Sequence, residues 1–141
     1  MKKQLTILAA LASCFLVTSA SAQEVKIVAN SAVSASDITS DLASKIFLKQ
    51  TSKFADGSAA VPVYQAKTAP ARIAFDKAVL GKTVAAVETF WQGQIFSGKD
   101  TPPASKPSDD DVIAFVKSTP GGIGYVSSAA ATAGVKVLVL K

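Results

Sequence analysis

Short apolar runs typical of strands alternate along the chain with segments of helical periodicity, and this alternation is the strongest constraint on the fold. The strand-like runs are residues 25–30, 59–64, 123–127 and 135–140. The segments with apolar side chains at helical spacing are 37–49, 70–80, 82–96 and 109–118, and 128–134 reads as a short helix or turn. This order predicts a single three-layer α/β domain in which helices cover both faces of a mixed sheet.

Local signals place the ends of these elements. Ser36 is the expected N-cap of the first helix, and Ser108 that of the helix over 109–118. Pro70 suits the first turn of a helix, where its missing N–H is not needed, and Gly81 is expected to end that helix. Residues 97–108 hold three prolines and no apolar period, so they are expected to form a loop.

The first 22 residues have the features of a signal peptide. A basic start, "MKK", precedes the apolar run "LTILAALASCFLV", and Ala20 and Ala22 form the small-x-small pattern of a cleavage site. We therefore expect residues 23–141 to be the exported domain, periplasmic or secreted. A lipoprotein signal ending at Cys14 is the alternative, and the apolar residues after Cys14 count against it.

Composition excludes several classes of function. Without Lys2 and Lys3, 13 basic and 10 acidic side chains remain, and this net charge of +3 is too small and too scattered to indicate nucleic-acid binding. The chain has no His, and its one Cys lies in the leader. Catalytic triads, thiol chemistry and the usual metal ligands are therefore missing, so we expect a non-enzymatic protein without a cofactor or metal. No apolar stretch after residue 22 is long enough to cross a bilayer.

Three motifs have both a functional and a structural interpretation. Asp109, Asp110 and Asp111 could bind a divalent cation, but favourable charge at a helix N-terminus is the preferred interpretation. The glycines of "TPGGIGYVS", 119–127, precede a strand rather than a helix, so they do not form a dinucleotide fingerprint. The aromatic residues Phe90, Trp91 and Phe96 could form a ligand shelf, but are expected to lie in the core, with Val84, Val87, Trp91 and Ile95 on one helix face.

The stretch "NSAVSAS", residues 30–36, is a further candidate. It lies between an expected strand and an expected helix, and its hydroxyls together with free backbone N–H groups could hold an oxyanion. The alternative is a capped loop without a ligand.

Several segments together resemble the phosphate-binding proteins of bacterial ABC phosphate transporters. They are "ASKIFLKQTSKFADGSAAVPVYQ", the pair Arg72 and Phe75, and above all "DVIAFVKSTPGGIGYVS", and the likeness runs from about residue 38 to 126. The resemblance implies one lobe of the type II periplasmic-binding-protein fold. Members of that family clamp phosphate between two lobes, and this chain has the length of about one.

The resemblance also implies an anion site, and the chain departs from it there. Where the family typically has "DGSGTR..F", this chain has "KTAPARIAF", residues 67–75, so two hydroxyl donors are lost while the arginine, Arg72, remains. We expect Arg72 to lie at an open helix start, with Lys67 and Thr68 adding a charge and a hydroxyl. The expected oxyanion ligands are Arg72, Lys67, Thr68, Ser31, Ser34 and Ser36.

Two functions follow as expectations. The first is an exported solute-binding-like protein that holds phosphate or another oxyanion for an ABC transporter or a sensing system. The second is a periplasmic interaction or scaffold module that kept the lobe and lost the ligand, and the replacement of the hydroxyl residues by "APA" at 69–71 favours it.

Overall fold

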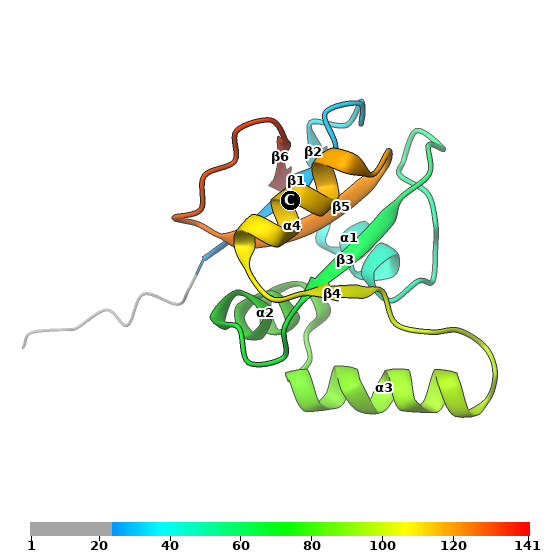
Figure 1. Cartoon of the computed structure of the whole chain (residues 1–141). Helices are drawn as coiled ribbons and strands as arrows, with labels where there is room; N and C mark the ends of the chain where they lie inside the picture. Colours follow the sequence, from blue (N-terminus) through cyan, green and yellow to red (C-terminus); the bar gives the residue numbers. More distant parts are fainter. Residues whose placement is uncertain (1–23) are drawn as a thin grey trace, which may run out of the picture.

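One six-stranded mixed sheet organises residues 24–141, the part of the chain that the computed structural model describes. The strand order is β2-β6-β1-β5-β3-β4 (Figure 1). The strands are β1 Val25–Ala29, β2 Asp37–Ile38, β3 Val61–Gln65, β4 Ala104–Lys106, β5 Gly122–Ser127 and β6 Lys136–Leu140. The leader expected over residues 1–22 lies outside the described residues.

Strand directions decide which loops can meet. β1 lies between β5 and β6 and is antiparallel to both, whereas β3 is parallel to β5. Ile123 of β5 pairs with Ala29 at the end of β1 and with Pro62 near the start of β3. The loop that follows β1 and the loop that follows β3 therefore leave from opposite ends of the sheet.

The helices form a layer on each face of the sheet. They are α1 Ser40–Phe47, α2 Pro70–Phe75, the π-helical turn η1 Asp76–Leu80, α3 Val84–Phe96 and α4 Asp109–Ser118. One core cluster joins the first four to one face of the sheet, with Phe47, Phe75, Trp91 and Tyr125 among its members. The second lies under α4 and is built on Val28, Val63, Val112, Val116 and Val126. The expected three-layer mixed α/β architecture is confirmed.

The predicted start of the first helix is wrong by three residues. Thr39, not Ser36, is the N-cap of α1, and its side chain accepts a hydrogen bond from the N–H of Leu42 at 3.1 Å. Residues 37 and 38 instead form β2, which pairs with the end of β6. The carbonyl of Ser36 accepts a hydrogen bond from the N–H of Val139 at 3.1 Å. Ser36 therefore pairs with the sheet and does not cap the helix.

The predicted helix over 70–80 is present with an irregularity. It begins at Pro70 as expected, continues through η1, and ends at Gly81, whose φ of 64° is the left-handed conformation that favours glycine. The hydrogen bonds shift to the π pattern from Asp76, the residue that carries a buried carboxylate.

The apolar face predicted for α3 is only half buried. Val87 and Trp91 lie in the core, but Ile95 is 53% and Phe96 is 96% exposed. The interpretation of Phe96 as a core residue is therefore wrong. α3 lies at the margin of the molecule in Figure 1, below the sheet, so its C-terminal end has no layer to pack against.

Two connections also differ from expectation. The segment 97–108, predicted to be a loop, contains β4, whose three residues pair with the end of β3. Residues 128–135 form turns and no helix. Ser108 caps α4 as predicted, with its hydroxyl 3.3 Å from the N–H of Asp111. Among residues 24–141, no helix has the length and apolar character needed to span a membrane.

Candidate anion-binding site

The serine-rich loop after β1 is fixed to α4 by Asn30. The Asn30 amide donates to the carbonyls of Val116 and Lys117 at 2.8 and 3.1 Å, and its carbonyl oxygen accepts from the N–H of Ala32 at 2.9 Å. Asn30 is buried, and it satisfies carbonyls in the last turn of α4 that would otherwise lack partners. This loop therefore has a clear structural role, and the part played by Asn30 was not predicted from the sequence.

The electrostatics of this loop disfavour an oxyanion. The hydroxyls of Ser34 and Ser58 both donate to the carboxylate of Asp56, and these hydrogen bonds lower the pKa of Asp56 to about 2. A charged carboxylate therefore lies beside Ser34 at neutral pH. Ser31 and Ser36 are exposed.

The stretch "KTAPAR" covers part of the connection from β3 and the first turn of α2, at the other end of the sheet. Lys67 and Thr68 are exposed in the connection, and the N-cap residue Ala69 offers no side-chain hydrogen bond. The start of α2 thus lacks the hydroxyl donors that the resemblance would have placed there.

Arg72 is buried, contrary to the expectation of an open site. It is only 1% exposed, on the face of α2 turned toward the sheet. Its Nε donates to Oδ2 of Asp76 at 2.7 Å and its Nη1 to the carbonyl of Gln65 at 3.1 Å. The guanidinium carbon lies 4.3 Å from the centre of the Tyr64 ring, a cation–π distance. Arg72 is therefore held in place by its own chain.

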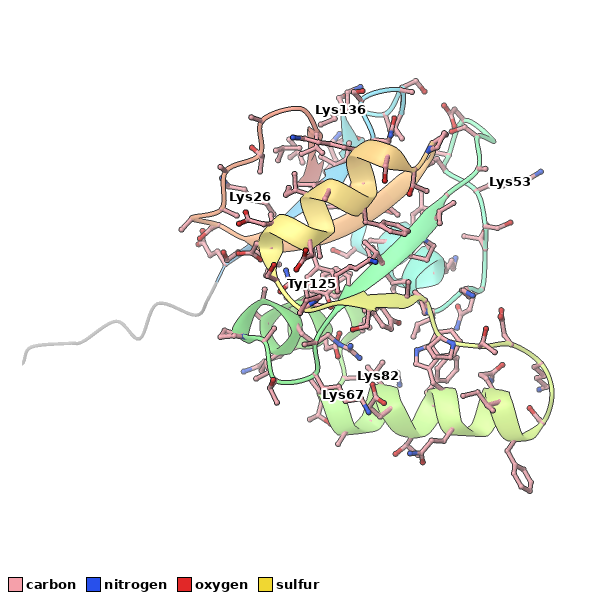
Figure 2. The ribbon with its side chains drawn as sticks, viewed as in Figure 1. Lys26, Lys53, Lys67, Lys82, Tyr125 and Lys136 are labelled. Atoms are coloured by element: carbon pink, nitrogen blue, oxygen red, sulfur yellow. The ribbon has the colours of Figure 1, made fainter. Side chains whose placement is uncertain are left out.

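Glu88 of α3 completes this cluster. Its Oε1 accepts from Nη2 of Arg72 at 3.4 Å, and its Oε2 lies 2.7 Å from Nζ of Lys67. The Glu88 side chain is 28% exposed and that of Lys67 is 67% exposed, so this end of the cluster opens to solvent. Figure 2 shows Lys67 between the β3–α2 connection and α3. One carboxylate thus bridges two cations.

The inner end of the cluster is buried and charged. Burial raises the pKa of Asp76 above its usual value of 3.8, although Arg72 opposes this. Burial alone would lower the pKa of Arg72, but the hydrogen bond to Asp76 and the charge of that carboxylate raise it, so the guanidinium stays protonated. Oδ1 of Asp76 has no hydrogen-bond partner within the described part of the chain. The Arg72–Asp76 pair is therefore a fixed element of the core.

The structure separates the six predicted ligands into two groups. Lys67 and Arg72 meet at Glu88, with Thr68 in the same connection, whereas Ser31, Ser34 and Ser36 lie at the opposite end of the sheet. A ligand the size of phosphate cannot contact both groups. Asp76 and Glu88 were not predicted as members of the site. Asp76 could have been found from its i+4 spacing to Arg72, but nothing local links Glu88 to them.

The other motifs have structural roles. Asp109 accepts from Nε2 of Gln65 at 2.7 Å and from the N–H of Ser127 at 3.1 Å, so it ties the start of α4 to β3 and β5. Among residues 24–141, no cluster of three His, Cys, Asp or Glu side chains is placed to hold a metal. Trp91 is buried and donates to the Tyr64 hydroxyl at 3.2 Å, as expected of a core residue.

Solved structures of phosphate-binding proteins share this fold. An ABC-type phosphate transport receptor from Vibrio cholerae matches with a TM-score of 0.63 and 15% identity, over 84% of this chain and 46% of that one. PstS from Borrelia burgdorferi matches with a TM-score of 0.65 and 13% identity, over 84% and 47%. A Clostridium perfringens protein named as a phosphate ABC transporter substrate-binding protein, solved with bound phosphate, matches with a TM-score of 0.64 and 14% identity, over 84% and 45%.

These matches establish the architecture. The chain has the fold of one portion of a periplasmic phosphate-binding protein, and the resemblance noted from the sequence is confirmed at that level. The chain spans less than half the length of each of these structures. No protein-family profile and no curated protein sequence matches it.

Proposed function

We propose that this chain is a non-enzymatic, solute-binding-like protein that holds a small oxyanion, such as phosphate, at Lys67 and Arg72. One observation carries the proposal: both cations contact the carboxylate of Glu88. Lys67 lies 2.7 Å from one of its oxygens and Arg72 lies 3.4 Å from the other, so the geometry suits an anion with two acceptor oxygens. An arginine guanidinium suits oxyanion recognition because its donors form a fixed fork. Thr68 supplies a hydroxyl in the same connection.

The test is calorimetric titration of the purified protein with phosphate and with sulfate. We expect saturable binding with a dissociation constant near the millimolar range, or about 4 kcal/mol. Lys67→Gln is the informative variant, because Lys67 is exposed and its loss leaves the core intact. It should weaken binding severalfold. Lys77→Gln is the matched control, since Lys77 is an exposed lysine on η1 and no ion pair to it occurs among the described residues. Equal binding by the two variants, or no heat with either anion, would refute the proposal.

The proposed setting is the periplasm, with delivery to an ABC transporter as the proposed partnership. The support is the fold shared with phosphate transport receptors, together with the signal-peptide pattern of residues 1–22. Radiolabelling with palmitate would separate a cleaved signal from a lipoprotein at Cys14, because only the latter incorporates the label.

A protein-interaction role is the second candidate. Its support is Phe96, which is 96% exposed beside the half-exposed Ile95 at the end of α3. Large exposed apolar side chains are common at protein interfaces. If phosphate and sulfate both fail to bind, then crosslinking in the periplasm from position 96 should capture a partner, and crosslinking from the exposed Ala85 on the same helix serves as the comparison.

A further inference from the structure

The Glu88 carboxylate occupies the position that the proposed ligand would need. It places one oxygen 2.7 Å from Nζ of Lys67 and the other 3.4 Å from Nη2 of Arg72. A tetrahedral oxyanion that bridged the same two cations would overlap this carboxylate. Binding at this site and the present position of Glu88 therefore exclude each other.

We propose that Glu88 is an internal competitor that sets the affinity of this site for phosphate and sulfate. This inference rests on the proposed function. In the structure the side chain of Glu88 fills the site, and the oxyanion enters when that carboxylate swings away into solvent. Lys67 and Arg72 therefore bind either the Glu88 carboxylate or the free oxyanion, but not both at once.

The two carboxylates around Arg72 differ in how readily they can leave. Asp76 is fully buried, lies on the helical segment that carries Arg72, and makes the shorter contact at 2.7 Å. Glu88 comes from a separate helix, reaches Arg72 at 3.4 Å, and is 28% exposed. Rotation of the Glu88 side chain exposes its charge to water, whereas Asp76 has no such route. Only Glu88 can therefore be exchanged for a ligand without opening the core.

Charge balance gives the direction of the effect. Lys67 and Arg72 are neutralised by Asp76 and Glu88, so the cluster carries no net charge with Glu88 in place. A tethered group competes at an effective concentration in about the millimolar range, which is enough to mask weak binding of a free anion. Without the Glu88 charge the cluster carries one net positive charge and has no internal competitor.

The experiment compares Glu88→Gln with the unmodified protein in calorimetric titrations with sulfate and with phosphate. Gln keeps the size of Glu and an acceptor oxygen for Arg72, so the fold should be preserved, and a thermal melt checks this. We expect the affinity for both anions to rise at least about tenfold, within the range usual for coupling between two sites. Asp41→Asn is the matched control because it removes one exposed ion pair, the 2.8 Å contact with Lys45 within α1, a helix that carries none of the cluster residues. Its affinity should equal that of the unmodified protein.

A double variant separates failure of this inference from failure of the proposed function. Lys67→Gln combined with Glu88→Gln should lose the gain, because the external anion then lacks one of its two cations. If the unmodified protein binds and Glu88→Gln binds equally or more weakly, the inference is overturned while the proposed function stands. If neither protein binds either anion, both fail. If only Glu88→Gln binds, and the double variant does not, the inference holds and the unmodified protein is closed to these anions.

Discussion

Arg72 shows how a residue with the chemistry of a ligand contact can belong mainly to the core. Its side chain is buried, and it donates hydrogen bonds to Asp76 and Gln65 and lies over the ring of Tyr64. Only Nη2 faces the solvent-accessible Glu88. A variant of Arg72 therefore reports on folding before it reports on binding.

Replacing Arg72 by Met should destabilise the protein by about 3–5 kcal/mol, because the Asp76 carboxylate would be left buried without its partner. Urea denaturation followed by circular dichroism measures this. The double variant Arg72→Met with Asp76→Leu removes both charges and should recover most of the loss. Lys77→Met, an exposed position on the next turn, should change stability little. Equal stabilities for the two single variants would contradict the assigned role.

Asp109 should make folding stability depend on pH in acid. Burial would raise its pKa, but hydrogen bonds from Ser127 and Gln65 outweigh this and hold the pKa below the usual 3.8. The resulting stabilisation is complete above about pH 4 and is lost as pH falls through the lowered pKa. Asp109→Asn should therefore flatten the decline in stability between pH 4 and pH 2. Asp110→Asn, exposed on the same turn, should retain the slope of the unmodified protein.

Residue chemistry was predictable where it depends on local sequence and unpredictable where it depends on packing. Ser108 as a cap and Trp91 as core followed from local patterns and are confirmed. The burial of Arg72 did not follow, because it arises from β3, α2 and α3 meeting, three segments separated in the sequence. The same holds for Glu88, whose two partners lie in the β3–α2 connection and on α2.

At the scale of elements, Gly124 of β5 lies where side chains of α4 and β3 leave no room for a Cβ. A Cβ at this position would lie 2.7 Å from Cγ1 of Val112 and 2.8 Å from Cγ1 of Val63. Both distances are far below van der Waals contact. Gly124 therefore permits the sheet to pack against α4, a role that the glycine-rich sequence alone did not reveal.

Substituting Gly124 by Ala should destabilise the protein by about 1–3 kcal/mol through overpacking. Gly93→Ala is the matched control: Gly93 lies in α3, where an added Cβ meets nothing within 4 Å. That change should instead stabilise the protein by about 0.5–1 kcal/mol, the helix preference of Ala over Gly. Thermal unfolding of both variants tests the opposite signs, and a change of the same sign in both would count against this account.

Long periodic elements were found from the sequence and short ones were not. The helices that begin at Pro70 and Asp109 and the strands β1, β5 and β6 match their predicted positions closely. β2 has two residues and β4 has three, and each forms because a neighbouring strand offers free backbone groups. No periodicity can appear in so few residues, so their pairing depends on tertiary structure alone.

At the scale of the whole molecule, the sheet depends on its C-terminal strand. β6 lies between β1 and β2, and its Leu138 is buried in the larger core. The neighbouring strand β1 would lose one of its two partners if β6 were absent. Removal of β6 is therefore expected to leave β1, the third strand in the order, as a new edge of the sheet.

Deletion of residues 136–141 should abolish cooperative thermal unfolding, since β1 would become an edge strand and β2 would lose its only pairing within the described sheet. Val139→Thr in the same strand is the control, because Val139 is exposed and the change keeps the backbone and the β-branched shape. It should unfold much as the unmodified protein does. A truncated chain with a sharp melting transition would show that the remaining strands suffice.

The central position of β1 also has a consequence for how the chain folds. Val25 pairs with Ser127, and Ile27 pairs with Leu138, so the first described strand finds both neighbours near the end of the chain. Pairings between residues so distant in sequence form slowly, because the entropy of closing a long loop is lost before the new contacts stabilise the chain. During synthesis β1 therefore remains unpaired until the residues of β5 and β6 have been added to the chain. The apolar stretch "VKIVA" is exposed throughout that interval, when an unpaired strand is most prone to associate with other chains.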